Sequence, residues 1–153
     1  MASRAPEISA AVPALTAERP VTWPKRTRAR LGNGLEVVLA EAHSIPKFHG
    51  ELYLRAGNAL FSDRSTGLAE MTATLVRTGT SKRTSRQIEE DLRRLGADLG
   101  SSAGQDTSAI GFAGLSEFAE PLLQLVNELA REAAFPENEF ERERRQKLEE
   151  VKL

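Results

Sequence analysis

The sequence contains no cysteine, which excludes disulfide bridges, thiolate zinc sites and a cysteine nucleophile. No apolar run approaches the roughly 18 residues that a membrane span requires, and the N-terminus lacks the apolar stretch of a secretory signal. The net charge is -1, so no bulk electrostatic field favours binding to nucleic acid. What remains is a chain of 153 residues with 40% hydrophobic residues, enough for one domain with a real core.

The first 22 residues differ in composition from the rest of the chain. They are rich in alanine and proline, and Pro6, Pro13 and Pro20 interrupt any helical period, a pattern typical of flexible termini. We therefore interpret residues 1–22 as a flexible leader and residues 23–153 as the globular part.

The globular part begins with predicted strands. Residues 26–40 are expected to form a hairpin, because the central residues of the turn Gly32-Asn33-Gly34 can both take positive φ. Residues 48–55 predict a third strand. A second hairpin of small residues is expected from 97 to 113.

Helical spacing of apolar residues predicts four helices. The first covers residues 66–77, and its predicted apolar side is Leu68, Met71, Thr72 and Leu75. The second begins at a capping box of Thr84 and Gln87 and ends at Gly96, and its predicted stripe is Ile88, Leu92 and Leu95.

The last two helices follow the second hairpin. One starts at Ser116, and its predicted buried face consists of Leu122, Leu125, Val126 and Leu129. The other runs from Glu137 to the C-terminus and is highly charged, with a sparse apolar side formed by Phe140, Leu148 and Val151. The chain ends inside this helix, so we expect it to be the first part of a longer domain. The element order predicts an α+β fold, mainly an antiparallel sheet backed by helices.

Several short motifs occur in a fixed order between residues 24 and 153. They are Leu31-Gly32-Asn33-Gly34-Leu35, Arg55-Ala56-Gly57, Gly67-Leu68-Ala69, Thr78-Gly79-Thr80, Leu95-Gly96-Ala97, Gly114-Leu115-Ser116 and Phe135-Pro136, the last followed by Glu141-Arg142-Glu143-Arg144. No single motif is specific, but their order resembles the N-terminal part of insulinase/pitrilysin-type zinc metallopeptidases, the family of the mitochondrial processing peptidase. The resemblance implies a half-domain of that type.

In active members of this family, Gly-Leu-Ala leads into the inverted zinc motif H-x-x-E-H. Two histidines four residues apart share one helix face, and the glutamate acts as base on the zinc-bound water. The resemblance places Glu70 at the first histidine, Ala73 at the glutamate and Thr74 at the second histidine. Glu150 falls about where a distal glutamate ligand belongs. The motif is therefore degenerate, and we expect neither catalytic residues nor bound metal in this chain.

Other candidate residues have simpler interpretations. His43 and His49 flank a proline break, and we expect surface or edge positions for them. Glu70 and Glu150 are themselves more typical of solvated helix carboxylates than of ligands. The charged run at residues 141–145 is typical of a solvated helix face with ion pairs. No glycine-rich phosphate loop is present, and Ser101 and Ser102 have no predicted base partner.

The resemblance implies a peptidase built from two similar halves that close around a peptide, in which one half or subunit holds zinc and the other is metal-free. It implies that this chain is a non-catalytic subunit, without a cofactor of its own, that completes a peptide-binding chamber for a zinc-bearing partner. Two alternatives stay open: a structural scaffold of the same fold, or a fragment of an active peptidase whose motif lies elsewhere.

The remaining expectations concern assembly and source. The exposed apolar side of the last helix predicts self-association of the chain. The alanine- and arginine-rich composition favours a bacterial source, with the periplasm or the cytoplasm as the compartment.

Overall fold

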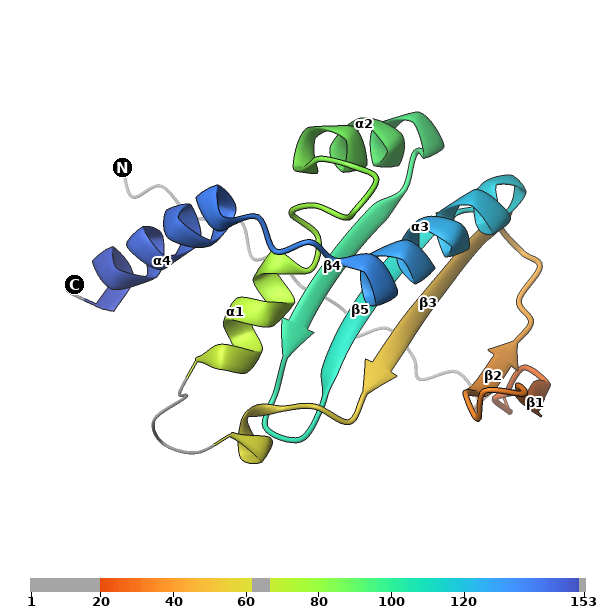
Figure 1. Ribbon diagram of the computed structural model, residues 1–153. Coiled ribbons are helices and arrows are strands. Elements are labelled where there is room, and N and C mark those ends of the chain that lie inside the picture. Colours follow the sequence, from red (N-terminus) through yellow and green to blue (C-terminus); the bar gives the residue numbers. More distant parts are fainter. Residues whose placement is uncertain (1–19, 62–66, 152–153) are drawn as a thin grey trace, which may run out of the picture. The chain divides into compact units, whose positions relative to one another are not determined.

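The computed structural model describes residues 20–61 and 67–151 (Figure 1). The chain separates into two compact units, Met1–His43 and Ser44–Leu153. Most of the predicted leader, residues 1–19, lies outside the described residues. Within the part that the structure describes, no helix is both long and apolar enough to span a membrane.

The first unit contains the predicted hairpin. Strand β1 (Arg26–Arg30) pairs antiparallel with β2 (Glu36–Ala40). The backbone N–H of Gly34 donates to the Leu31 carbonyl at 2.9 Å, and Gly34 takes a φ of 88°. Among the hairpin residues positive φ occurs at Gly34 alone, so the expected pair of positive φ angles is wrong. The turn is a three-residue loop closed by one left-handed glycine.

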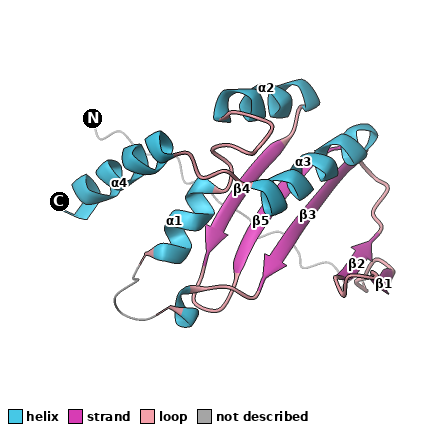
Figure 2. Cartoon of the chain, viewed as in Figure 1, coloured by secondary structure: helices cyan, strands magenta, loops and turns pink. Residues whose placement is uncertain are grey.

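The second unit is built on a three-stranded antiparallel sheet with the order β3-β5-β4 (Figure 2). Its strands are β3 (Lys47–Leu54), β4 (Asp98–Ala103) and β5 (Ser108–Leu115). The α+β class is confirmed, and so are the two strands of the hairpin predicted from 97 to 113. Gly50 is required here, because a Cβ at this position would lie 2.4 Å from the Phe112 ring.

The described residues of the same unit form four α-helices, which are labelled in Figure 1. They are α1 (Leu68–Leu75), α2 (Ser85–Leu95), α3 (Ala119–Glu132) and α4 (Glu137–Val151). Short 3-10 turns precede two of them, η1 (Asn58–Leu60) and η3 (Ser116–Phe118). All four predicted helices are confirmed. The predicted start of the first one, Thr66, lies outside the described residues.

The hydrophobic core lies between the sheet and helices α2 and α3. Its buried members are Ile88, Leu92, Ile110, Phe112, Leu122, Leu125, Val126 and Leu129. The predicted stripes of α2 and α3 are therefore confirmed. So is the capping box, in which the Thr84 side chain accepts from the Gln87 N–H and the Gln87 side chain accepts from the Thr84 N–H.

The predicted apolar face of α1 is wrong in part. Leu68 is 45% exposed and Thr72 is exposed, whereas Ala69, Ala73 and Leu75 are buried. The buried face therefore runs through two alanines, because α1 packs closely against β4 and large side chains do not fit there.

Candidate functional site

Helix α1 carries Glu70, Ala73 and Thr74, the three positions that the family resemblance predicts to be a degenerate zinc motif. Glu70 lies in its first turn, where the Asn58 side-chain amide donates to Glu70 Oε1. The other carboxylate oxygen, Oε2, is buried and has no hydrogen-bond partner among the described residues. Glu70 is thus held toward the η1 segment.

The other two motif positions are occupied by small side chains. Ala73 is 8% exposed, and its carbonyl accepts a hydrogen bond from the Ser101 hydroxyl on β4. The Thr74 hydroxyl donates to the Glu70 carbonyl at 2.9 Å. The methyl of Ala73 supplies no base, and the Thr74 hydroxyl is used within its own helix.

Glu150 lies on α4, a helix that contacts α1. The Glu150 side chain is exposed and accepts from the Gln146 amide at 3.3 Å. One turn or two earlier, Glu143 pairs with Arg142 at 2.9 Å. Over the described ranges, no group of three or more His, Asp or Glu side chains is placed to hold a metal ion.

The two histidines occupy exposed positions. His43 Nε2 lies 3.3 Å from Glu41 Oε2. His49 lies on β3, opposite Ala113 of β5. The expectation of surface or edge positions is confirmed for both.

Strand β4 is an edge of the sheet and lies beside α1. In the described part of the chain it pairs with β5 only. Two side-chain bonds join it to the C-terminal half of α1 and the residues just after it: Ser101 to the Ala73 carbonyl, and Arg77 Nη1 to the Leu99 carbonyl at 3.1 Å. The motif helix and the edge strand are therefore held together as one feature.

The sequence interpretation missed an ion pair whose carboxylate is buried. Glu128 on α3 is 8% exposed and pairs with Arg83, which also contacts Asp91 at 2.9 Å. The Thr80 hydroxyl donates to Glu128 Oε1 at 2.6 Å. Burial alone would raise the pKa of Glu128, but the hydrogen bonds from Thr80 and Arg83 outweigh it and hold that pKa below its ordinary value.

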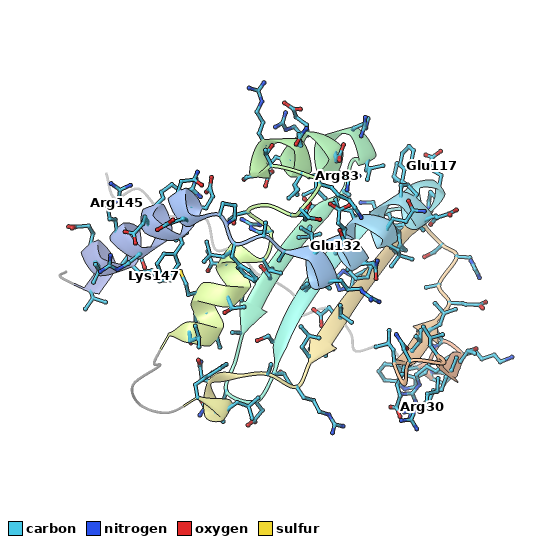
Figure 3. All side chains as sticks on the ribbon, in the orientation of Figure 1. Arg30, Arg83, Glu117, Glu132, Arg145 and Lys147 are labelled. Carbon is cyan, nitrogen blue, oxygen red and sulfur yellow. The ribbon has the colours of Figure 1, made fainter. Side chains whose placement is uncertain are left out.

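A second, more exposed ion pair joins Lys82 to Glu132 at 2.9 Å. Figure 3 labels Glu132 and Arg83, one member of each pair. The hydrogen bonds from Lys82 and Ser81 lower the pKa of Glu132. Helical spacing could have signalled the buried carboxylate but not its partner, because Glu128 follows Leu125 by three residues and precedes Leu129 on the face assigned to the core.

Comparison with known proteins identifies a family. The family model for insulinase (peptidase family M16) matches residues 36–153. The chain is 24% identical over 128 residues to cytochrome b-c1 complex subunit 1, mitochondrial, of Caenorhabditis elegans. It is 25% identical over 120 residues to the mitochondrial-processing peptidase subunit beta of Neurospora crassa. These alignments cover 84% and 78% of this chain but 27% and 25% of the relatives, so the chain spans about a quarter of their length.

Solved structures share the fold. The crystal structure of a peptidase M16 inactive domain from Pseudomonas fluorescens superposes with a TM-score of 0.74 at 26% identity, over 80% of this chain and 30% of that one. A protease from Helicobacter pylori superposes with a TM-score of 0.76 at 22% identity, over 84% of this chain and 31% of that one. The second likeness concerns the fold alone.

Proposed function

The chain belongs to the insulinase family of peptidases, peptidase family M16, and we propose that it serves as a non-catalytic member that binds peptide and leaves cleavage to a zinc-bearing partner with an H-x-x-E-H motif. The observation that carries this proposal is the buried methyl group of Ala73 at the position of the catalytic base. The structure of a family domain described as inactive, from Pseudomonas fluorescens, supports it.

The donor groups on α1 and α4 do not suit catalytic zinc. Glu70 is engaged by Asn58, Thr74 by its own helix, and Glu150 by Gln146. Carboxylates without imidazole select poorly for zinc. We therefore propose that the chain holds no cofactor and that zinc belongs to the partner.

The edge strand β4 supports the peptide-binding part of the proposal. An edge strand presents unpaired backbone groups, and an extended peptide can add to them as a further strand. A Cβ at Gly100 would meet nothing within 4 Å, so the face of the sheet is open at this residue of β4. The peptide would then lie next to α1.

A second candidate function is a structural one. The similarity to cytochrome b-c1 complex subunit 1 favours a scaffold of the same fold that takes no part in proteolysis. A third is a fragment of an active zinc peptidase whose motif lies in another part of the protein, which the quarter-length match to relatives allows.

Mixing experiments separate these candidates. The chain, within its full-length protein, is combined with a purified family member that carries an intact H-x-x-E-H motif and comes from the same genome. The proposal expects a stable complex and peptidase activity that exceeds that of either protein alone. A complex without a gain in activity supports the scaffold, and activity of the full-length protein alone supports the third candidate.

A restoration experiment tests the motif assignment itself. The triple change Glu70→His, Ala73→Glu and Thr74→His rebuilds a zinc face on α1, with Glu150 as the third protein ligand. We expect zinc titration to show tight binding, and the further change Glu150→Ala to weaken it by about 10-fold or more. Equal affinities with and without Glu150 would show that the distal ligand was placed wrongly.

The apolar residues of α4 suggest how the chain associates. Leu148 is 50% exposed and Val151 is 84% exposed, with Phe140 at 38%. Contiguous exposed apolar surface favours association. We propose that the isolated chain self-associates through α4, and light scattering over a range of concentrations should show a mass that rises with concentration. A constant monomer mass would favour a self-sufficient binding module.

A further inference from the structure

The segment that leaves α1 and the segment that enters α4 are joined to each other. Thr80 forms an isolated antiparallel bridge with Ala133, the Ser81 N–H donates to the Glu132 carbonyl at 3.0 Å, and the Ala134 N–H donates to the Gly79 carbonyl at 3.0 Å. We call residues 79–83 together with residues 128–136 the junction.

Packing at the junction is close. A Cβ added to Gly79 would lie 3.0 Å from Pro136 Cγ, so the two segments touch where the loop before α4 turns. Gly79 and Thr80 are both buried. A side chain at 79 would require Pro136 to shift by a few tenths of an ångström, so the close approach of the two segments favours glycine here.

Side chains reinforce the junction in two layers. The inner layer is the buried Glu128 carboxylate, which binds the Thr80 hydroxyl and the Arg83 guanidinium. The Thr80 hydroxyl also accepts the Arg83 backbone N–H at 2.9 Å, which fixes the turn. The outer layer is the Lys82–Glu132 pair, in which both side chains are at least 36% exposed.

A buried ion pair of this kind contributes position more than stability. The Glu128 side chain is buried, whereas the Arg83 side chain is 35% exposed. Removing the carboxylate from water offsets much of the attraction, so apolar residues of similar size often stabilise a fold equally well. What the pair supplies is a fixed arrangement, because its hydrogen bonds are directional. Glu128 is the one buried charged side chain in the described ranges, and it lies at this junction.

We propose that the Arg83–Glu128 pair is a positioning device that sets the spacing and angle between α1 and α4. Helix α1 ends at Leu75, shortly before the junction begins at Gly79, and α4 starts at Glu137, directly after the junction. They carry the positions that the family resemblance pairs across the site, Glu70 on α1 and Glu150 on α4. The claim that this spacing shapes a peptide site rests on the proposed function. The claim that the ion pair sets the spacing does not.

The absence of cysteine allows a direct test. Thr72→Cys on α1 and Arg145→Cys on α4 replace exposed residues, and nitroxide labels at these two sites report the distance between the helices by pulsed electron paramagnetic resonance. The labelled parent should give one narrow distance peak. Glu128→Gln should lose that single peak and give a broad or shifted distribution at temperatures where the variant is folded.

Two further variants decide between positioning and stability. Glu132→Gln removes only the outer pair and should keep the narrow peak. The double change Arg83→Met with Glu128→Leu replaces the inner pair by apolar groups and should stay folded, as circular dichroism would show, yet lose the narrow peak. If Glu128→Gln does not fold, this double variant decides between positioning and stability.

A parent-like narrow peak in the folded double variant would overturn the proposal, and so would a double variant that does not fold, because the pair would then serve stability. Since no peptide or partner is present in this measurement, its result is independent of the mixing experiment that tests the proposed function.

Discussion

Helices α3 and α1 flank the same sheet but are attached to it in different ways. Helix α3 buries Leu122, Leu125, Val126 and Leu129, which are between 0% and 4% exposed. Helix α1 buries Ala69, Ala73 and its terminal Leu75, and hydrogen bonds from Ser101 and Arg77 join it to β4. Helix α3 thus supplies four large residues of the core, whereas α1 is attached through two alanines, Leu75 and polar contacts.

This difference indicates where side chains can be substituted without unfolding the chain. Large aliphatic side chains contribute several kcal/mol each when buried, whereas a single neutral hydrogen bond contributes about 1 kcal/mol. A helix attached as α1 is can change its polar side chains and keep its place. Our proposal that Glu70, Ala73 and Thr74 stand at degenerate motif positions fits that division.

The largest expected effect lies in α3. Leu129→Ala should lower the free energy of unfolding by about 3 kcal/mol, because Leu129 is fully buried and the substitution leaves a cavity. Chemical denaturation measures it. The matched control Leu123→Ala, at a residue 47% exposed on the same helix, should cost about 0.5 kcal/mol. Equal losses would remove the distinction between the two faces of α3.

An intermediate effect is expected at the junction. Glu128→Gln should cost about 2 kcal/mol at neutral pH, because it weakens charge-assisted hydrogen bonds in a buried position. The exposed pair of Arg86 and Glu90 offers a control, and Glu90→Gln should change stability by about 0.3 kcal/mol. Similar losses for the two variants would contradict the inner position of Glu128.

The same carboxylate makes stability depend on pH. Its folded pKa lies below the ordinary value of 4.5, so the ionised form favours folding. That contribution is complete above pH 4.5 and is lost as the pH falls through the folded pKa. Unfolding free energies measured from neutral to acid pH should therefore fall less steeply for Glu128→Gln than for the parent, and parallel curves would count against this assignment.

The smallest expected effect tests the polar attachment of α1. Ser101→Ala removes the hydrogen bond to the Ala73 carbonyl and should cost about 1 kcal/mol. Its neighbour Ser102 is exposed on β4, and Ser102→Ala should be close to neutral. In the Ser101→Ala variant, amide hydrogen exchange should also become faster in α1 and stay unchanged in α3. Uniform exchange changes in both helices would contradict separate attachment.

Helix α2 could be predicted from the sequence alone. Its capping residue Thr84, its stripe of Ile88, Leu92 and Leu95, and its end at Gly96 each follow from local rules, and the structure agrees. Those rules act within one turn of helix, so no knowledge of distant segments is needed. The same is true of the four apolar residues of α3.

The burial pattern of α1 and the contacts of the junction could not be predicted from local sequence. The burial of Ala73 and the exposure of Leu68 depend on how closely β4 approaches, which is set by pairing between segments far apart in the chain. The pairing of Arg83 with Glu128 joins residues 45 positions apart. Local spacing predicts neither contact, although it does mark Glu128 as a carboxylate on an apolar face.

The zinc content of the purified protein tests the central claim most directly. We propose that α1 lacks the metal ligands and the base at Glu70, Ala73 and Thr74, so that this chain takes no catalytic metal. Elemental analysis after purification without chelators, with an intact H-x-x-E-H family member prepared in parallel, should find no stoichiometric zinc in the chain and about one zinc per chain in the control. A tightly held zinc ion at about one per chain would contradict the account.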